Sequence, residues 1–397
     1  MSPLALAWRT TMRYRARALL AVVGVAVIGA LLFDMLLLSR GLLLSFADLL
    51  NAEGFDVRVV ASQGFSRIPI PDSRTLAAAI RAMAGVEDVV EIRAEAAEIG
   101  RVGARRRVTL VGRSPSHGHP WRLVSGSNVP DSSASADCDA VVDRALPAAI
   151  GATIGSTVHV TAQPGGATAL PPVDCRITGI ADFGFNAADE HTLATTMAAL
   201  ERAMGESRPG DAEVILASTA PNADRGAVTR AIARLRPDVR AYSNEDVVEQ
   251  FNRNGFAYFR QISVVLSTLT TAFAFLLVAT LLTVSINQRL GEIAALRALG
   301  IARGRIAAML FWESALLVGA GAVAAVPLGA ALAVGLDHVL RQMPGLPEGL
   351  HFFVFERRAL VVHLAVFGIT AAASAAYPIW LAARLPIAET LRREVVG

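Results

Sequence analysis

The sequence predicts an α-helical membrane protein with four transmembrane helices and a large mixed α/β extracytoplasmic domain inserted between the first and second helices. Three observations lead to this prediction. Hydrophobic residues make up 53% of the 397 residues, and they are concentrated in four long blocks. A long stretch of mixed polar and apolar sequence, residues 40–260, separates the first two blocks. Arginines gather in the short segments that would lie on one side of the membrane.

Each of the four blocks is long enough to span a membrane, because a helix needs about 20 apolar residues to cross roughly 30 Å of hydrocarbon. The predicted transmembrane helices are residues 18–39, 261–287, 306–336 and 359–383. The first block could instead be a signal peptide, since basic residues precede it. However, it is long for a signal sequence, and no Ala-x-Ala cleavage site follows it. We therefore expect an uncleaved span.

Arginine-rich flanks predict the orientation of these helices, because short cytoplasmic segments are enriched in basic residues. Residues 1–17 and 288–305 contain four arginines each, and residues 384–397 contain three. Four crossings place all three segments in the cytoplasm, with both termini inside and residues 337–358 outside. Every basic side chain apart from histidine is arginine, which suggests GC-rich coding. We therefore expect a multi-pass protein of a bacterial cell membrane.

No sequence pattern for catalysis is present. The chain contains no lysine, so it cannot hold the Gly-x-x-x-x-Gly-Lys-[Ser/Thr] motif of a P-loop NTPase. Hydrolase patterns are also absent, and His117 and His119 have no cysteine or further carboxylate near them in the sequence to complete a metal site. The net charge of +3 gives no indication of nucleic-acid binding. We expect a non-catalytic chain with no bound metal or cofactor.

Residues 40–260 are long enough for their own core and show both α and β patterns. Segments with strand-like alternation are residues 55–60, 89–99, 106–111, 157–161, 176–180, 213–217 and 239–242. Helical patterns occupy residues 73–83, 143–150 and 224–235. A stalk helix is expected from about Asn244 into the second span. Cys138 and Cys175 both lie in this domain, where they could pair or stay as free thiols.

Charged and small residues inside the spans are further candidates. Asp34 is expected near the hydrated outer interface and His363 as a packed residue, whereas Glu313 would lie at the cytoplasmic interface, paired with an arginine of the preceding loop. Small residues that allow helices or protomers to approach closely are Gly24, Gly29, Gly319, Gly321 and Gly329.

The cytoplasmic segment between the second and third spans is the most informative part of the chain. Its apolar residues Ile293, Leu296 and Leu299 form a stripe, and Gly300 is suited to end a helix. An apolar stripe in the cytosol needs a partner, either the membrane surface or a protein groove. Periodicity does not choose between these two.

This segment resembles the signature of FtsX-like permeases, the MacB/LolC/LolE superfamily of ABC transporters. The pattern Arg-x-x-Glu-Ile-x-x-Leu-Arg-Ala-x-Gly, a later Ile and a Glu in the next helix are met by Arg289, Glu292, Ile293, Leu296, Arg297, Ala298, Gly300, Ile306 and Glu313. The Pro- and Ala-containing end of the chain, residues 377–392, and the four-span layout match the family as well.

The resemblance implies a function. A separate ABC ATPase would hold ATP and Mg²⁺, two permease copies, identical or different, would pair, and membrane lipid would surround them. The helix docked on the ATPase would carry Arg289, Glu292, Ile293, Leu296, Arg297, Leu299 and Gly300. Nucleotide-driven closure would then move the extracytoplasmic domain to export or extract a lipophilic substrate or lipoprotein. The alternative is a signalling subunit that activates an extracytoplasmic partner such as a cell-wall hydrolase.

Overall fold

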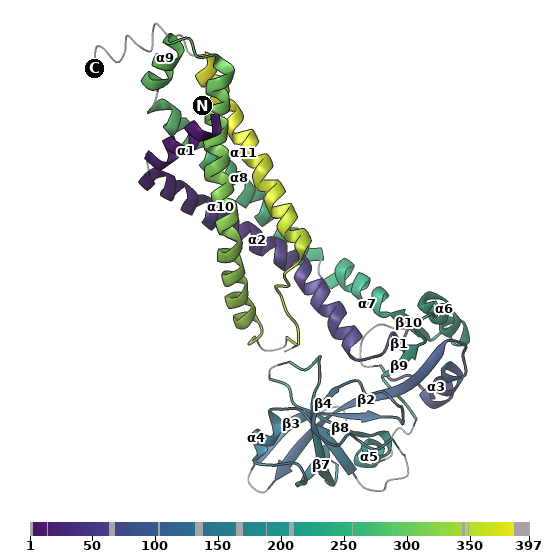
Figure 1. The fold of residues 1–397 in the computed structure, drawn as a ribbon. Coiled ribbons are helices and arrows are strands. Elements are labelled where there is room, and N and C mark those ends of the chain that lie inside the picture. The colour runs from purple at the N-terminus through teal and green to yellow at the C-terminus, as the bar shows by residue number, and fades with distance from the viewer. Residues whose placement is uncertain are drawn as a thin grey trace. The chain divides into compact units, whose positions relative to one another are not determined.

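The computed structural model describes residues 3–13, 15–62, 68–101, 104–131, 138–163, 170–187, 189–205, 210–255, 257–288, 290–343, 346–347 and 349–384. The chain divides into two compact units (Figure 1). Unit 1, which is helical, comprises Met1–Leu42, Phe256–Leu340 and His351–Gly397. Unit 2, which holds the β-sheet, comprises Leu43–Gly255 and Arg341–Leu350. The short segment between the last two long helices therefore belongs to the sheet-containing unit.

The long helices are α2, α8, α10 and α11, and two short helices, α1 and α9, accompany them. Their bounds are α1 Pro3–Arg13, α2 Arg15–Ala52, α8 Ala257–Asn287, α9 Leu290–Ala298, α10 Arg303–Leu340 and α11 Arg357–Arg384. Helix α2 runs well past residue 39, where we had placed its end, and its last turns belong to unit 2. The sequence did not reveal this extension, because Arg40 and Gly41 interrupt the apolar block after Leu38.

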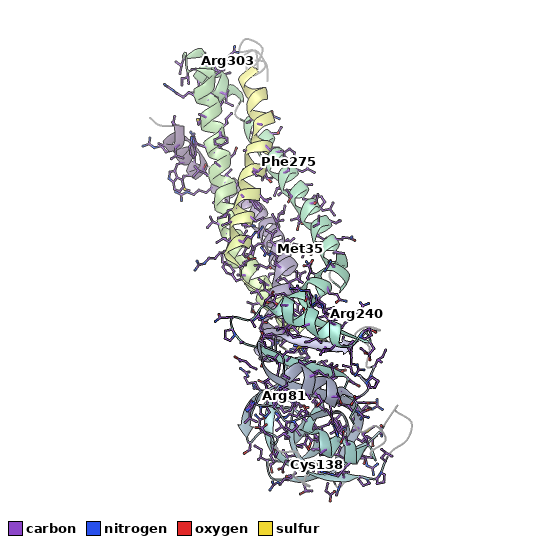
Figure 2. All side chains as sticks on the ribbon, turned by 90° about the vertical axis from the view of Figure 1, so that its right-hand side faces the viewer. Met35, Arg81, Cys138, Arg240, Phe275 and Arg303 are labelled. Atoms are coloured by element: carbon purple, nitrogen blue, oxygen red, sulfur yellow. A yellow bond between two sulfur atoms is a disulfide. The ribbon has the colours of Figure 1, made fainter. Side chains whose placement is uncertain are left out.

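Three helices within the described residues are long and apolar enough to cross a membrane. They span Ala18–Ala52, Gln261–Leu281 and Arg303–Leu340. Helix α11 has the predicted position but is not among these three, so the fourth crossing and the orientation stay predictions. Exposed apolar side chains, Phe275 among them, project from the helices of unit 1 (Figure 2). This outward apolar surface is typical of a helix bundle in lipid.

An apolar cluster joins the four long helices of unit 1. Its buried members are Val25, Leu32, Ala274, Val278, Val318, Ala322 and Phe367. The cluster takes residues from α2, α8, α10 and α11, so the helices that the sequence separates by more than 200 residues form one bundle. A second cluster around Phe33, Leu37, Ala333 and Ala359 extends the same contacts along α2, α10 and α11.

Unit 2 is built on one sheet of ten described strands. They are β1 Val57–Ala61, β2 Val86–Arg101, β3 Ala104–Arg113, β4 Arg122–Gly126, β5 Cys138–Val142, β6 Thr157–Ala162, β7 Val173–Asp182, β8 Thr192–Thr196, β9 Val214–Thr219 and β10 Val239–Ser243. The order is β10-β1-β9-β2-β3-β8-β5-β7-β4, and β6 pairs with β2 and β7. The helices of this unit are α3 Ser73–Arg81, α4 Leu146–Ile150, α5 Met197–Ala203, α6 Arg225–Leu235 and α7 Asn244–Gln250.

The two largest apolar clusters of unit 2 lie on different parts of this sheet. One lies on β1, β9 and β10 under α3 and α6, with Ile80, Ile215 and Ile232 fully buried. The other lies on β3, β5, β6, β7 and β8 with α4 and α5. The expected β-α-β sequence β9-α6-β10 is present, but β1 lies between β9 and β10 and is antiparallel to both. Unit 2 is therefore a mixed α/β domain with two modules on a continuous sheet.

The segment expected to form a stalk helix contains a change of helix type. Ser243 and Asp246 form a capping box at the start of α7, in which each side chain pairs with the other residue's backbone N–H. Helix α7 ends at Gln250, and a π-helix follows over Phe251–Gly255. The Phe251 ring stacks on Phe46 of α2, with 4.1 Å between centroids. The last turns of α2 and the segment before α8 therefore contact each other within unit 2.

Candidate functional site

Helix α9 is the core of the candidate site, and its end is defined by Gly300. Gly300 has φ +87°, a left-handed conformation that favours glycine. Its N–H donates to the Arg297 carbonyl at 3.0 Å, and the Ile301 N–H donates to the Leu296 carbonyl at 3.2 Å. These two hydrogen bonds are those of a Schellman motif, in which Leu296 and Ile301 also pack together. The motif sets the direction in which the chain enters α10.

The predicted apolar stripe does not face outward as a whole, which corrects our expectation. Ile293 is 4% exposed and packs with Ile286 of α8 and with Ile306 and Leu310 of α10. Leu296 is half-buried at the edge of the same cluster. Because α8 and α10 cover Ile293 and part of Leu296, these two side chains do not need a second protein to cover them, whereas Leu299 is not part of this cluster.

The outer face of α9 is a different set of residues. Glu292, Ala295, Ala298 and Gly300 are exposed, and the Leu299 side chain is 81% exposed. Leu299 is therefore an apolar side chain that the rest of the chain leaves largely uncovered. Arg297 is half-buried, and Arg289 lies outside the described residues.

Glu313 lies on α10, about three turns after the helix begins at Arg303. It is 5% exposed, and the neighbouring Ser314 hydroxyl donates to the Leu310 carbonyl at 2.9 Å. The position faces the interior of unit 1, whereas Trp312 is 42% exposed. Glu313 is therefore an interior group of the bundle near its α9 end.

Four of the five predicted packing glycines contact another helix of unit 1. A Cβ added at Gly29 would lie 2.6 Å from the Ala325 Cβ, and one at Gly321 would lie 2.5 Å from Val25 Cγ1. A Cβ added at Gly24 would lie 3.2 Å from the nearest atom of α8, and one added at Gly329 would lie 3.1 Å from the nearest atom of α2. Gly319 is different, because no atom lies within 4 Å of its added Cβ.

The polar side chains of Asp34 and His363 in unit 1 are both buried, and the sequence predicted this for only one of them. Asp34 is 2% exposed, and neither of its carboxylate oxygens has a hydrogen-bond partner. The expectation of a hydrated position was wrong, because helix packing around α2 is not visible in a single hydrophobic block. His363 is fully buried, as expected of a packed residue, and its Nε2 lies 3.2 Å from the Ala322 carbonyl oxygen.

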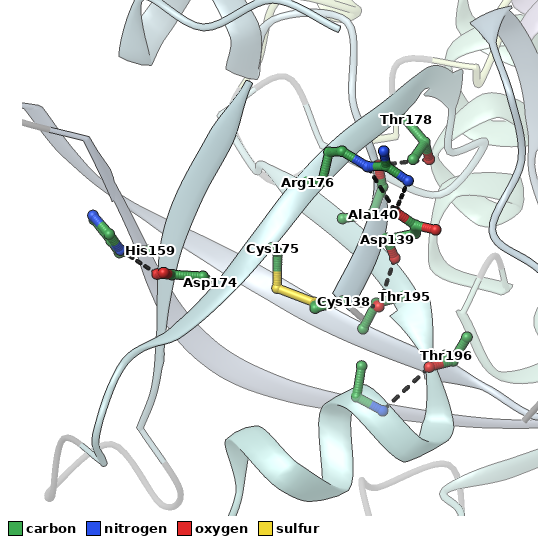
Figure 3. The surroundings of a disulfide bond; sticks show 11 residues. Cys138, Asp139, Ala140, His159, Asp174, Cys175, Arg176, Thr178, Thr195 and Thr196 are labelled. Atoms are coloured by element: carbon green, nitrogen blue, oxygen red, sulfur yellow. Dashed lines mark hydrogen bonds and ion pairs between the residues drawn. A yellow bond between two sulfur atoms is a disulfide. The ribbon is translucent and has the colours of Figure 1, made fainter. Parts of the chain in front are cut away.

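Cys138 and Cys175 form a disulfide in the second core of unit 2 (Figure 3). They are register partners in the parallel pair β5 and β7, with Cα atoms 4.4 Å apart. Beside them, the Arg176 guanidinium donates to the Asp139 carboxylate at 2.9 Å. Of the two alternatives left open by the sequence, the structure contains the paired one.

A charged pocket lies where the two modules of unit 2 meet. It has a volume of about 430 Å³, and its lining includes Arg74, Glu91, Arg113 and Glu201. The Ser73 hydroxyl donates to Glu91 at 2.5 Å, and burial raises the pKa of the Glu91 carboxyl. Arg74 of α3 pairs with Glu201 of α5, so an ion pair connects the two modules here. The sequence did not single out this pocket, because its residues are far apart in the chain.

His117 and His119 lie beside two different carboxylates. His117 is 99% exposed and lies 3.9 Å from Asp88, while His119 Nε2 lies 3.8 Å from Asp131. Within the part of the chain that the structure describes, no group of three or more His, Cys, Asp or Glu residues could hold a metal ion.

Comparison with protein families gives two matches that together cover most of the chain. The model of the MacB-like periplasmic core domain matches residues 18–235, more than half of the chain. The model of the FtsX-like permease C-terminal domain matches residues 264–387, which include α9. No curated protein matches the chain.

Solved structures of extracytoplasmic regions are also similar. The periplasmic region of MacB from Actinobacillus actinomycetemcomitans is 13% identical, with a TM-score of 0.39, over 51% of this chain and 96% of that one. The extracellular domain of the ABC-type transporter YknZ from Gram-positive bacteria is 14% identical, with a TM-score of 0.35, over 47% and 98%. A domain of a permease-like protein from Porphyromonas gingivalis is 13% identical, with a TM-score of 0.32, over 48% and 89%.

All three TM-scores lie below 0.5, so the assignment rests on the family models. These models cover the sheet-containing unit and the helices that follow it. The chain belongs to the family of FtsX-like, MacB-type permeases, membrane proteins that work as transmembrane subunits of ABC transporters with ABC ATPase partners.

Proposed function

We propose that this chain couples ATP hydrolysis on a separate ATPase to movement of unit 2, and thereby exports or extracts a lipophilic substrate or lipoprotein. The observation that carries the proposal is the outer face of α9, where Glu292 and the 81% exposed Leu299 adjoin the Gly300 cap. ATP and Mg²⁺ are held by the partner, and this chain contributes no catalytic group.

The structure of α9 is suited to transmit force. Ile293 anchors the helix to α8 and α10 through buried contacts, so a push on α9 reaches both helices without a flexible step. The Gly300 cap satisfies carbonyls of the last helical turn and fixes the backbone next to Leu299. An exposed leucine at such a position is suited to a helix-in-groove contact, in which a few apolar side chains dock into a partner.

Within unit 2, the end of α2 is held by contacts with the start of α7 and with β1. The Asn244 amide donates to the Asn51 side chain at 3.0 Å and to the Phe55 carbonyl at 2.9 Å. Nearby, Arg58 of β1 pairs with Glu53 at 2.6 Å, and both side chains are largely buried. The end of α2 and the start of α7 are therefore tied to each other and to β1. Movement of either would be passed to the sheet.

The remaining elements of the proposal follow the family. We place four crossings in a bacterial cell membrane, with both termini and α9 in the cytoplasm. A second permease copy would pair with this one, with membrane lipid around the pair. The exposed Gly319 offers a place of close approach for that copy.

A second candidate function is activation of an extracytoplasmic protein such as a cell-wall hydrolase. The charged pocket of unit 2 favours it, because Arg74, Glu91 and Arg113 are unsuited to an alkyl chain. A polar site of this kind would instead bind a polar group of a partner protein. Charge reversal at Arg74 would weaken such a contact and leave lipid-linked transport unchanged.

The test of the proposal is substitution of Leu299 in the full-length chain, co-expressed with the ATPase. Leu299→Asp should lose copurification of the ATPase and stimulation of its activity by roughly tenfold or more, because a central apolar anchor is worth about 2 kcal/mol or more. Leu299→Met is the matched control, since it keeps an apolar side chain of similar volume and should behave like the wild type.

The readouts are ATPase copurification in mild detergent and ATPase rate in nanodiscs. Retention of the wild-type unfolding temperature by Leu299→Asp would show that the fold is intact, as expected for a side chain in solvent. Full ATPase binding and stimulation in both variants would remove α9 from the contact and end the proposal.

A further inference from the structure

Helix α1 carries an exposed apolar stripe that the proposed function does not use. Leu4, Trp8 and Met12 recur every four residues, so they lie on one face of the helix. Their side chains are 43%, 54% and 41% exposed. Arg9 and Arg13, also exposed, follow one position later along the same helix and form a basic stripe beside the apolar one.

The opposite edge of α1 is held against unit 1. Ala7 is fully buried and Thr11 is 8% exposed, and the Thr11 hydroxyl donates to the Ala7 carbonyl at 2.9 Å. Helix α1 contacts α10 within this unit and lies beside it in Figure 1. One edge of the helix is therefore attached to the bundle while the two stripes face away from it.

The charge of this region has one sign. The first 33 residues contain no Asp or Glu, and Arg9, Arg13, Arg15 and Arg17 supply four positive charges. The Arg15 Nε donates to the Met12 carbonyl at 3.2 Å, which satisfies a carbonyl at the end of α1. The charge of this segment is therefore complementary to that of an anionic surface.

The start of α2, which follows α1 in the chain, also carries exposed apolar side chains. Leu19 and Leu20, at the start of that helix, are 64% and 74% exposed, and Val23 is 49% exposed. Because α2 is one of the helices long and apolar enough to span a membrane, its exposed leucines are covered by lipid. Since α1 ends two residues before α2 begins, the same lipid is within reach of the apolar stripe of α1.

We propose that α1 lies in the plane of the membrane–water interface and binds anionic phospholipid. Leu4, Trp8 and Met12 enter the boundary between headgroups and acyl chains, where tryptophan is favoured. Arg9 and Arg13 contact phosphate groups at the surface, as in other basic amphipathic helices at membranes. Because the buried edge of α1 packs on α10, the lipid surface gains a direct contact with the helix that follows α9.

The test uses the full-length chain in nanodiscs of phosphatidylcholine alone or of an equimolar mixture with phosphatidylglycerol. Since Cys138 and Cys175 are bonded to each other, a single introduced cysteine provides the thiol for a nitroxide label. Labels are placed on the apolar stripe (L4C or M12C) and on the basic stripe (R9C or R13C). A label at Leu269 of α8, which is 49% exposed, serves as the membrane-embedded reference.

The expected result is several-fold greater accessibility to oxygen than to a water-soluble nickel complex at positions 4 and 12, with the reverse at positions 9 and 13. Phosphatidylglycerol should increase the interfacial population, and R9Q with R13Q should lower it about fivefold for each arginine removed. Water accessibility at position 12 equal to that at position 13 would overturn the proposal. So would indifference to phosphatidylglycerol, or shielding from both reagents that appears only when the ATPase is bound.

Discussion

The interiors of the two units are packed in different ways. Among the described residues, the largest fully buried side chains lie almost entirely in unit 2, for example Ile177, Leu193 and Ile215, whereas Phe33 is their one member in unit 1. The interior of unit 1 is rich in alanine and glycine, as at Ala30 beside Gly329 and at Ala325 beside Gly29.

The difference follows from the solvent around each unit. In water, burial of large apolar side chains stabilises a fold by about 25 cal/mol for each Å² removed. In lipid this gain is absent, and helices associate through close van der Waals packing between small residues. The comparison predicts that unit 2 responds to changes in its large core and covalent bond, while unit 1 responds to added volume at its glycines.

The largest expected effect is loss of the disulfide in unit 2. Replacing Cys138 and Cys175 with serine should reduce the free energy of unfolding of unit 2 by about 2–5 kcal/mol, since the bond closes a loop in the unfolded chain. Unit 1 should be unchanged. Unfolding followed by fluorescence of the buried Trp121 measures this.

Reduction of the wild-type protein is the control for this prediction. It should give the same loss of stability, and it should leave the serine variant unaffected. Unchanged unfolding after reduction would mean that the bond does not stabilise unit 2.

A smaller effect is expected from added volume in unit 1. Gly321→Leu forces atoms against Val25 of α2, and overpacking of this kind costs about 1–3 kcal/mol. Gly335→Leu is a matched control on the same helix, where no atom lies within 4 Å of the added Cβ, and its cost should be near zero. Thermal unfolding in one detergent compares the two, and equal melting temperatures would contradict the packing assigned to α2 and α10.

The smallest expected effect is a pH dependence confined to unit 2. Burial raises the pKa of Glu91, so the folded state holds its proton more tightly than the unfolded chain does. This contribution to stability is complete below the ordinary pKa of a glutamate, about 4–5. It is lost as the pH rises through the raised pKa of the folded state.

Glu91→Gln should remove this part of the pH dependence, and the exposed Glu87→Gln should leave it intact. The measurement is the midpoint of urea unfolding between mildly acidic and mildly alkaline pH. Identical profiles for the wild type and Glu91→Gln would show that the Glu91 proton does not matter to the fold.

Local patterns in the sequence predicted most elements of unit 2 that have one exposed face. The segments 73–83, 106–111 and 239–242 correspond to α3, β3 and β10. The strands β4, β5 and β8 were missed, and none of them shows this alternation. All five residues of β8 are buried, because it lies between β3 and β5 with both faces covered, and its sequence Thr-Leu-Ala-Thr-Thr has no period of two.

The candidate site was predicted as a segment but not as a surface. Glu292 and Leu299 were recognised with the rest of this segment, yet the sequence pattern assigned Ile293 and Leu296 the same importance as Leu299. Which of them faces outward depends on the approach of α8 and α10, and a stripe on one short helix does not contain that information. The exposed stripe of α1 was not predicted for the same reason, and the sequence showed this segment only as a basic one.

By itself the sequence determined the class of this protein, because hydrophobic blocks, arginine-rich flanks and the absence of lysine are local properties. It also determined the family, since the segment from Glu292 to Gly300 carries its signature in consecutive residues. The tertiary structure alone decided that Cys138 meets Cys175, that Asp34 is buried, and that Leu299 remains exposed. Burial and pairing are properties of elements brought together from distant parts of the chain, so no local pattern records them.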